Sequence, residues 1–484
     1  MLFNSIGYLI FLPVTVLLYY LLPYRFRWAL LLAVSYFFYL LWHIEFVLVL
    51  ISATLVSYFV ALKMGQIPKK KQRRKYLVFS VIINLGMLVF FKYLGFFTEI
   101  VNQVAGLAGR SSVIPYYSIL IPIGISFYTF QTIGYTIDVY MGVTRPEKNI
   151  GIYALFVSFF PLILAGPIER GRRLIPQLHV EHTFDPQLFA SGLRLILWGM
   201  FKKIVIADRL SIFVQPVFNQ IGYFHGPEIA IAIILKMVQV YADFSGYTDI
   251  AIGSARLLGF RLSPNFNRPF SAQSIASFWS RWHISLTSWM RDYVYFSLPF
   301  KIHGKPANWR LNLNLLIIFV LVGFWHGPYW NFIIFGLLHG SYMVLANISR
   351  PFMSGFNRVS GLTKAPRLLK GLNIMATFLL VCSTGFFFGS HPLHDSFLMI
   401  RNLADFSQTG NALLIPILKN GDLLLGILLI FFMLWFEYLV AARSFASKFL
   451  RKPVAIRYTA YLFMLFFILV FGVFSSQKFF YFQF

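Results

Sequence analysis

Apolar runs close to the length of a membrane span follow one another along most of the chain, and they limit its fold more than any other feature. Of the 484 residues, 58% are hydrophobic and only 12% are charged, whereas soluble domains carry about 25% charged residues. A bilayer core requires about 20 apolar residues in a helix, and lipid excludes unpaired backbone groups. The sequence therefore predicts an all-α polytopic membrane protein with roughly eleven crossings, in which some shorter runs are half-helices or re-entrant segments. The runs are 5–23, 28–42, 46–64, 76–97, 115–135, 151–167, 188–206, 228–242, 311–326, 329–348, 371–389, 421–440 and 457–475.

Basic loops between these runs predict the orientation of the chain. "YRFR" at 24–27 and "PKKKQRRK" at 68–75 are rich in Lys and Arg, which collect in cytoplasmic loops. Both loops are cytoplasmic if the two runs between them form a hairpin, which places the N-terminus outside the cytoplasm. The basic stretches 350–370 and 451–457 place the C-terminus outside by the same rule. The first run has neither a basic leader nor a small-residue cleavage site, so we expect a retained span.

The positive net charge is also explained by the basic loops between membrane spans. Lys and Arg number 42 against 16 Asp and Glu, which gives a formal net charge of +26. In a membrane protein this excess orients the spans and attracts anionic lipid headgroups. No basic stripe lies outside the membrane loops, so we expect no nucleic-acid partner. The single cysteine, Cys382, lies within an apolar run and is interpreted as core packing.

The middle of the chain differs in composition from both ends. Residues 136–310 are rich in Gly, Pro, Arg and Asp, and their apolar runs are interrupted. Charge and irregular backbone at membrane depth persist only when they are buried in protein or face a water-filled cavity. We therefore expect one integral-membrane domain, residues 1–484, whose functional core is 116–348. Residues 1–115 and 349–484 are then scaffold helices.

One stretch of this core, "FWSRWHISLTSWMRDYVYFSL" at 278–298, combines His283 with charged and aromatic side chains. A buried cluster of this kind is costly unless its members have partners or a function. Upstream, Asp243 and Asp249 are acidic groups that could neutralise nearby arginines. Ion pairing that fixes the helix bundle and participation in a reaction both remain open for them. The arginines of this part of the chain are Arg256, Arg281 and Arg291.

A second stretch, "LAGPIERGRRLIPQL" at 164–178, breaks a helix at Gly166–Pro167 and continues with Glu169 and Arg170. One interpretation is a cytoplasmic turn that carries positive-inside charge. The other is a basic entrance for an anionic donor such as the phosphates of coenzyme A. The residues alone do not separate the two.

His326 is the third unusual feature, because "LVGFWHGPYW" at 321–330 places an imidazole between apolar runs. A buried histidine is often a hydrogen-bonded core residue, but neutral imidazole is also a general base near pH 7. No G-x-S-x-G elbow is present, so the nucleophile is not obviously the protein's own. No H-E-x-x-H motif or Cys/His ligand set is present, and we expect no metal.

Several stretches together resemble the membrane-bound O-acyltransferase (MBOAT) superfamily, and in particular its alginate O-acetyltransferase branch, which is related to the D-alanine transfer protein of teichoic acid modification. The resemblance extends over the whole chain. It rests on "FWSRWHISLTSWMRDY", "VGFWHG", "ISFYTFQTIGYTIDVY" at 125–140, "LAGPIERGRRLIPQ", "YADFSGYTDIAIG" at 241–253, "FNRPF" at 266–270 and the final "FFYFQF".

The resemblance implies a fold, a reaction and residue roles. The fold would be a ring of about eleven transmembrane helices with short or re-entrant helices around a central tunnel. Acetyl-CoA would be the donor substrate, with no permanently bound cofactor, and His326 and His283 would be the catalytic histidines. The acyl group would pass to an SGNH-hydrolase-like partner outside the bacterial cytoplasmic membrane for O-acetylation of a polysaccharide. The side chains that we expect near substrate or donor are Trp279, Arg281, Trp282, Arg291, Asp292, Trp325, Asp243 and Arg170.

Three other functions remain open at this point. A polysaccharide or lipid-linked sugar transporter would use the charged centre as a pathway, although no repeat typical of transporters is visible. A related enzyme would transfer a D-alanyl-type acyl group from a carrier protein. A scaffold that recruits a soluble acetyltransferase would depend on the outer segments 390–420 and 476–484 and on neither histidine.

Overall fold

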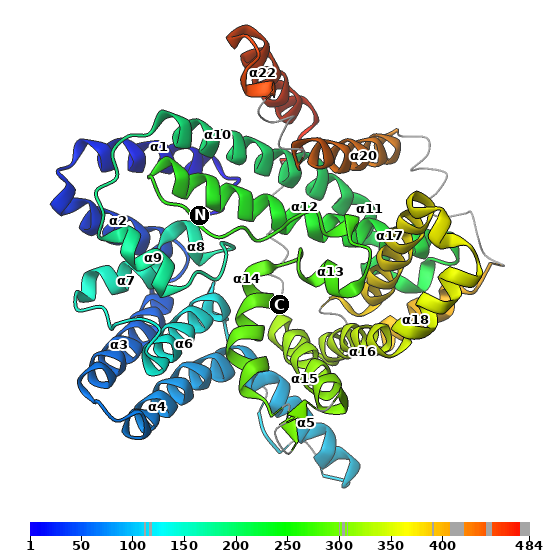
Figure 1. Ribbon diagram of the computed structural model, residues 1–484, viewed down its shortest axis with the longest axis horizontal. Helices are drawn as coiled ribbons and strands as arrows, with labels where there is room; N and C mark the ends of the chain where they lie inside the picture. Colours follow the sequence, from blue (N-terminus) through cyan, green and yellow to red (C-terminus); the bar gives the residue numbers. More distant parts are fainter. Residues whose placement is uncertain are drawn as a thin grey trace. The chain divides into compact units, whose positions relative to one another are not determined.

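A computed structural model of the protein describes most of the chain (Figure 1). The chain divides into two compact units: residues 1–196 with 248–264, and residues 197–247 with 265–484. Helices α10 (Pro186–Met200) and α12 (Pro227–Leu257) each contribute residues to both units. The division at residues 115 and 348 that we expect from the sequence concerns function and stays a prediction. The described residues are 1–110, 113–115, 119–299, 301–302, 305–306, 308–389, 392–406, 421–441 and 448–474.

The first unit is built around α6 (Ile125–Met141), which is buried along nearly its whole length. Helices α3 and α4 pack beside α6, as Figure 1 shows, and α7 and α9 contact it as well. Helix α1 begins after Ser5, whose hydroxyl accepts the Tyr8 N–H, and α7 begins after Asn149, whose side chain accepts two backbone N–H groups. The other elements of this unit, apart from parts of α10 and α12, are α1 (Ile6–Leu21), α2 (Tyr24–Leu40), α3 (Ile44–Gln66), α4 (Lys70–Leu88), η1 (Val89–Tyr93), α5 (Leu94–Leu107), α7 (Ile150–Ser158), α8 (Phe160–Ile163) and α9 (Gly171–Leu178).

The second unit combines long helices with short, irregular ones. Helices α15 (Asn308–His326) and α16 (Trp330–Val359) lie side by side, and the short α13 (Ile275–Trp279) packs on α16. A two-residue antiparallel pair, β1 (Lys301–Ile302) with β2 (Lys305–Pro306), precedes α15. The remaining elements are η2 (Phe201–Ala207), α11 (Asp208–Asn219), η3 (Ile221–Tyr223), η4 (Pro269–Ser271), α14 (Ile284–Trp289), η5 (Met290–Val294), η6 (Tyr295–Ser297), η7 (Leu362–Lys364), α17 (Pro366–Ser383), η8 (Thr384–Phe387), α18 (Leu393–Leu403), α20 (Asp422–Ala441) and α22 (Val454–Phe471).

Eight helical segments in the described residues are long and apolar enough to cross a membrane. Two shorter apolar helical segments, Ile6–Leu21 and Ile150–Ile163, accompany them. The prediction of a polytopic all-α membrane protein is therefore confirmed. The eight segments are Ile44–Gln66, Lys70–Leu107, Pro227–Leu257, Asn308–His326, Trp330–Val359, Pro366–Phe387, Asp422–Val440 and Val454–Phe471.

Two apolar runs that we expected to span do not form one long regular helix, for identifiable reasons. In the run 115–135, helix α6 begins only at Ile125, because Gly124 adopts a left-handed conformation with φ of 74°. The run 188–206 passes from α10 into the π-helix η2, which holds the buried Lys202 and Lys203. Such local breaks explain why fewer of the described helices are long enough to span a membrane than the roughly eleven crossings that hydropathy predicts.

Candidate active site

His326 is the last residue of α15, where the following Gly327–Pro328 ends the helix. Its side chain is buried, with 2% of the residue exposed. The ring lies among aromatic neighbours, with centroid distances of 5.3 Å to Phe388 and 5.8 Å to Phe335. The sequence prediction that this imidazole is buried is therefore confirmed.

Glycines allow α15 and α16 to approach closely beside His326. A Cβ atom at Gly323 would lie 2.1 Å from the Phe332 carbonyl oxygen, and one at Gly336 would lie 2.2 Å from the Phe319 carbonyl oxygen. Only glycine therefore fits at these two crossings, as in other closely packed membrane helices. The turn after His326 is as tight, because a Cβ at Gly327 would meet the Phe332 ring at 2.3 Å. These contacts fix the imidazole at the end of a rigid helical hairpin.

A small cavity adjoins His326 inside the second unit. Its volume is about 10 Å³, which is about the smallest space that holds one water molecule. No charged carboxylate, lysine or arginine lines it, so the surroundings of the imidazole are largely apolar. The lining residues are Met237, Phe278, Trp279, Trp282, His326, Phe335, His339, Val381 and Phe388. An acyl group needs more room than this, so its entry requires some of these side chains to move.

Trp325 connects the two histidines that the sequence singles out. Its ring centroid lies 5.0 Å from that of His326 and 5.6 Å from that of His283. All three residues are almost fully buried. The structure thus brings His326, His283 and Trp325 into one cluster within one unit, although His283 does not line the cavity beside His326.

His283 has an unusual backbone and a defined tautomer. It precedes α14 with φ of 42°, in the left-handed region, and such conformations in non-glycine residues cost about 1–3 kcal/mol and cluster at functional sites. Its Nδ1 lies 3.1 Å from Oδ1 of Asn265. Because that oxygen can only accept, Nδ1 carries the proton and Nε2 of the neutral ring has the lone pair. His283 is therefore an oriented imidazole.

Asn265 is a residue of this site that the sequence analysis missed. It is 1% exposed, and its Oδ1 also accepts hydrogen bonds from the backbone N–H and the hydroxyl of Ser285, at 3.2 and 2.9 Å. The backbone donor fixes which side of the amide faces His283. Its position directly before "FNRPF" was the available signal, because a polar residue that leads into a motif often supports it.

His339 forms a second polar network that borders the cavity. The Trp279 indole N–H donates to Nδ1 of His339 at 3.2 Å, and Nε2 of His339 lies 3.1 Å from the Thr384 hydroxyl. Because Nδ1 accepts, Nε2 carries the proton and donates to Thr384, whose own hydroxyl donates to the Val381 carbonyl at 2.7 Å. This network joins α13, α16 and the end of α17, and it already uses the N–H donor of Trp279, which the sequence analysis expected near the substrate or the donor.

The charged side chains of the 278–298 stretch do not surround His326. Arg281 donates to the hydroxyls of Ser277 and Ser271, at 3.2 and 3.1 Å. Arg291 pairs with its neighbour Asp292 at 3.0 Å, and 61% of the Arg291 side chain is exposed. None of the three lines the cavity. Trp282 does line it, so among these candidates the aromatic residues are the ones nearest to His326.

Asp243 has a partner that the sequence analysis did not anticipate. Its Oδ1 lies 2.7 Å from Nζ of Lys203, which also contacts Asp208 at 2.7 Å. All three side chains are 5% exposed or less. The lysine, rather than Arg281 or Arg291, thus neutralises Asp243, and the next residue on α12, Phe244, packs edge-on against His283 at 4.8 Å. Asp249 instead interacts electrostatically with Arg256.

Comparison with known proteins identifies the family. The model of the MBOAT (membrane-bound O-acyltransferase) family matches residues 149–365. A protein named "Probable alginate O-acetylase" from Pseudomonas aeruginosa is 36% identical over 409 residues, which cover 84% of this chain and 75% of that protein. The chain belongs to the MBOAT family. It is a multi-pass membrane protein and an O-acyltransferase, as the sequence motifs predict.

The names of other MBOAT relatives refer to different acceptor molecules. The "Peptidoglycan O-acetyltransferase" of Helicobacter pylori is 34% identical over 332 residues, covering 63% of this chain and 62% of its own. The "Teichoic acid D-alanyltransferase" of Bacillus subtilis is 29% identical over 290 residues, covering 58% and 71%. The matched family region contains both His283 and His326.

Arg170 belongs to the first unit, whereas His326 belongs to the second. Its neighbour Glu169 is buried and accepts the backbone N–H and the hydroxyl of Ser263, at 2.9 and 2.8 Å. Burial raises the pKa of the Glu169 carboxyl, and the hydrogen bonds from Ser263 lower it. The MBOAT stretch 164–178 therefore has a structural role through Glu169, and a donor-binding role for Arg170 stays a prediction.

Proposed function

We propose that the protein transfers an acetyl group from cytosolic acetyl-CoA toward the O-acetylation of an exported polysaccharide. Its membership of an O-acyltransferase family supports the reaction class. The names of its relatives, an alginate O-acetylase and a peptidoglycan O-acetyltransferase, support acetyl as the group and a surface glycan as the acceptor. The observation that carries the proposal is the burial of His326 beside a small, mostly apolar cavity in this family context.

His326 acts as the general base in this proposal. The imidazole removes the proton of an acceptor hydroxyl, whose oxygen attacks the thioester carbonyl carbon and forms a tetrahedral oxyanion. The C–S bond then breaks, the ester forms, and the imidazolium returns its proton to the leaving thiolate, so that free thiol leaves. General-base assistance of this type contributes about 10²–10⁴-fold in rate, and correct positioning contributes further.

His283 orients the reacting groups rather than removing the first proton. Asn265 holds its ring in the tautomer that carries the proton on Nδ1. Trp325 contacts both imidazoles, so a change at either ring shifts the packing around the other. Trp282, which lines the cavity, is the proposed donor to the oxyanion, because Trp279, Arg281 and His283 already donate to other groups.

The size of the cavity supports a short acyl group. At about 10 Å³ the space beside His326 is too small for a long chain without extensive repacking. A two-carbon acetyl group needs the smallest displacement of the lining side chains. D-alanyl transfer is the second candidate, and the similarity to a teichoic acid D-alanyltransferase favours it to a lesser degree because fewer residues match.

The proposed setting is the bacterial cytoplasmic membrane. The basic loops at 24–27 and 68–75 support a cytoplasmic donor side, and both termini would be extracytoplasmic. The acceptor on that outer side would be an SGNH-hydrolase-like partner or the polysaccharide itself. Most of the outer segments invoked for a scaffold, 407–420 and 476–484, lie outside the described residues.

Mass spectrometry of the surface glycan from strains with the wild-type protein and with His326→Ala tests the proposal. We expect O-acetyl groups on the wild-type glycan and their loss from the variant, while the variant remains in the membrane at wild-type amounts. His394→Ala is the matched control, because that histidine side chain is 82% exposed, and acetylation should persist. Alanyl esters in place of acetyl esters would identify the second candidate. Normal acetylation in His326→Ala would refute the enzyme proposal.

A further inference from the structure

The first unit contains a second, much larger cavity, and the proposed reaction at His326 uses none of its lining residues. Its volume is about 210 Å³, which exceeds engineered protein cavities of about 150 Å³ that bind benzene. All of its lining residues belong to the first unit. The side chains that matter for recognition are Arg25, Arg27, Trp28, His179, His182 and Phe260.

Positive side chains line this cavity, and no aspartate or glutamate does. Arg25 and Arg27 are always charged, and two imidazoles accompany them. Helix α2, which begins at Tyr24, has no acidic residue in its first turn, so the positive end of its dipole adds to the potential of the arginines. The cavity therefore attracts an anion.

Arg27 is held in place before any ligand binds. Its Nε donates to the Leu22 carbonyl at 3.0 Å, and its Nη1 donates to the His182 carbonyl at 2.8 Å. Its guanidinium also lies over the Tyr19 ring, 5.1 Å from the centroid. A fixed guanidinium loses little side-chain entropy on binding and is well suited to phosphate oxygens.

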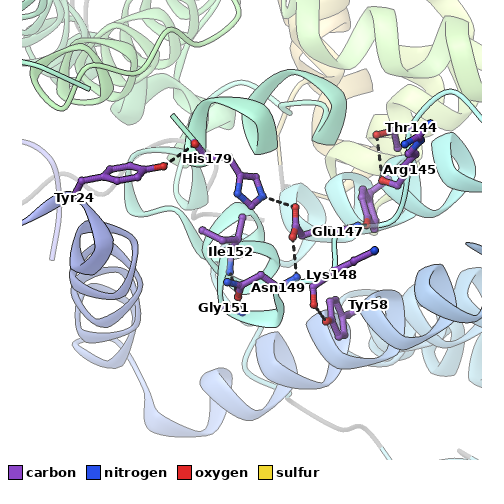
Figure 2. A network of polar contacts seen from close by, with 11 residues as sticks. Tyr24, Tyr58, Thr144, Arg145, Glu147, Lys148, Asn149, Gly151, Ile152 and His179 are labelled. Atoms are coloured by element: carbon purple, nitrogen blue, oxygen red, sulfur yellow. Dashed lines mark hydrogen bonds and ion pairs between the residues drawn. The ribbon is translucent and has the colours of Figure 1, made fainter. Parts of the chain in front are cut away.

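Another part of the wall, which includes Tyr24, Asn149 and His179, is held by the hydrogen bonds in Figure 2. The Tyr24 hydroxyl donates to the His179 carbonyl at 2.6 Å, and Nε2 of His179 donates to Glu147 at 2.7 Å. Glu147 also accepts the Asn149 N–H at 2.8 Å. The Glu147 carboxylate is thus directed at His179, which limits its repulsion of an anion.

His182 completes the polar part of the cavity. Its Nε2 donates to the Gln177 carbonyl at 2.8 Å, which leaves the Nδ1 lone pair on the other side of the neutral ring. Burial lowers the pKa of His182, and the charge of Arg27 lowers it further, although the Gln177 contact opposes both. An anion beside these groups would favour protonation of His182, which would add a second charge beside Arg27.

The rest of the wall is aromatic and aliphatic. Trp28 and Phe260 provide flat surfaces, and Leu31, Ile152 and Leu155 provide apolar ones. A free inorganic anion would leave this part of the cavity unused. The lining therefore fits a molecule that joins an anionic group to a flat or apolar one.

We propose that this cavity binds a phosphate-bearing ligand, with the phosphate on Arg25 and Arg27 and an attached flat or apolar group against Trp28 and Phe260. Phosphate suits the two guanidinium groups that line the cavity, and the volume accommodates more than the phosphate alone. Arg25 and Arg27 lie in the first turn of α2, within the basic stretch 24–27 that we predict to be cytoplasmic, so the source is a cytosolic nucleotide or an anionic phospholipid of the inner leaflet. This site does not depend on the proposed acetyl transfer.

Binding measurements on the full-length protein in phosphatidylcholine nanodiscs test this site. One arm titrates adenosine 3′,5′-bisphosphate by calorimetry, and the other measures retention of phosphatidylglycerol by native mass spectrometry. We expect the wild-type protein to bind at least one of these probes. The double variant Arg25→Gln/Arg27→Gln should weaken that binding at least tenfold, because each phosphate contact to a guanidinium is a charge-assisted hydrogen bond.

Two further variants control for a general loss of positive charge and for unfolding. Arg74→Gln removes one exposed positive charge from another basic loop and should leave binding unchanged. Arg25→Gln alone spares the backbone contacts of Arg27 and should weaken binding without unfolding the protein. Binding by the nucleotide identifies a soluble ligand, and retention of the lipid identifies a headgroup. Failure of the wild-type protein to bind either probe, or equal binding by the double variant, would overturn the proposal.

Discussion

The two cavities of this protein differ in almost every physical property. The cavity beside His326 is about 10 Å³ and is lined by aromatic and apolar side chains together with His326 and His339, and His339 accepts a hydrogen bond from Trp279 in the same wall. The cavity of the first unit is about 210 Å³, basic, and lined in part by exposed side chains. Dry, pre-oriented surroundings strengthen proton transfer, whereas a charged, hydrated cavity captures an anion. The comparison therefore supports the proposed proton transfer beside His326 and the proposed ligand binding in the cavity of the first unit.

Replacing His283 should produce the largest effect among the groups around His326. We expect His283→Ala to lower the acyl-transfer rate about 100-fold, in line with the loss of an oriented catalytic partner. His283→Asn should restore most of the rate, because Asn tolerates the left-handed backbone and its amide reaches toward Asn265. Initial rates of purified variants with acetyl-CoA provide the measurement. An Asn variant as inactive as the Ala variant would contradict an orienting role.

Enlarging the cavity should alter the choice of acyl group. Met237→Ala removes a lining side chain, and we expect the propionyl-to-acetyl ratio of kcat/KM to rise about tenfold, since one methylene is worth about 1–3 kcal/mol in such a pocket. Competition between the two thioesters measures this ratio. Met399→Ala is the matched control, because Met399 is equally buried but does not line the cavity. An unchanged ratio in Met237→Ala would show that the size of this cavity does not determine which acyl group is transferred.

Breaking the network of His339 should have a smaller effect. Trp279→Phe keeps the aromatic ring but removes the donor to Nδ1 of His339, and we expect about a fivefold lower kcat, equivalent to about 1 kcal/mol. KM for the donor should stay within twofold, because the network positions the wall rather than binding the donor. Trp309→Phe, an exposed tryptophan, serves as the control. A change in KM alone would point to donor binding by Trp279.

The exposed pair of Arg291 and Asp292 should matter least. Arg291→Ala removes an ion pair that is largely in solvent, and such pairs contribute about 0–1 kcal/mol. We expect activity within twofold of the wild type and a melting temperature within the error of the measurement. A large loss of activity would show that the charged end of the 278–298 stretch participates after all, and it would weaken the contrast between the two cavities.

Hydropathy and motif reading predicted the membrane class and the family, because both depend on local sequence. The stretch around His326 also predicted its burial, since Gly327 and Pro328 end the helix inside an apolar environment. The sequence did not reveal Asn265 and Thr384, which lie 18 and 45 residues from their histidine partners. Such contacts depend on tertiary packing and have no periodic pattern.

Charge placement was predicted less well than burial. Arg281, Arg291 and Asp292 attracted attention because they lie next to His283 in sequence, yet their side chains contact nearby hydroxyls or each other. Asp243 was correctly expected to need a cation, but Lys203 comes from η2, a π-helix that local propensity does not predict. The basic cavity of the first unit likewise combines residues from distant segments, 24–28 and 178–182 among them.

The most direct test of the central claim measures release of coenzyme A thiol from acetyl-CoA by the purified protein in the presence of an acceptor alcohol. The release rate and the dissociation constant of acetyl-CoA should both be measured for the wild type and for His326→Gln. If the buried imidazole removes the acceptor proton, the variant loses about 10²–10⁴-fold in rate with unchanged donor affinity. A variant that releases thiol within a few-fold of the wild-type rate would contradict the assignment of chemistry to His326.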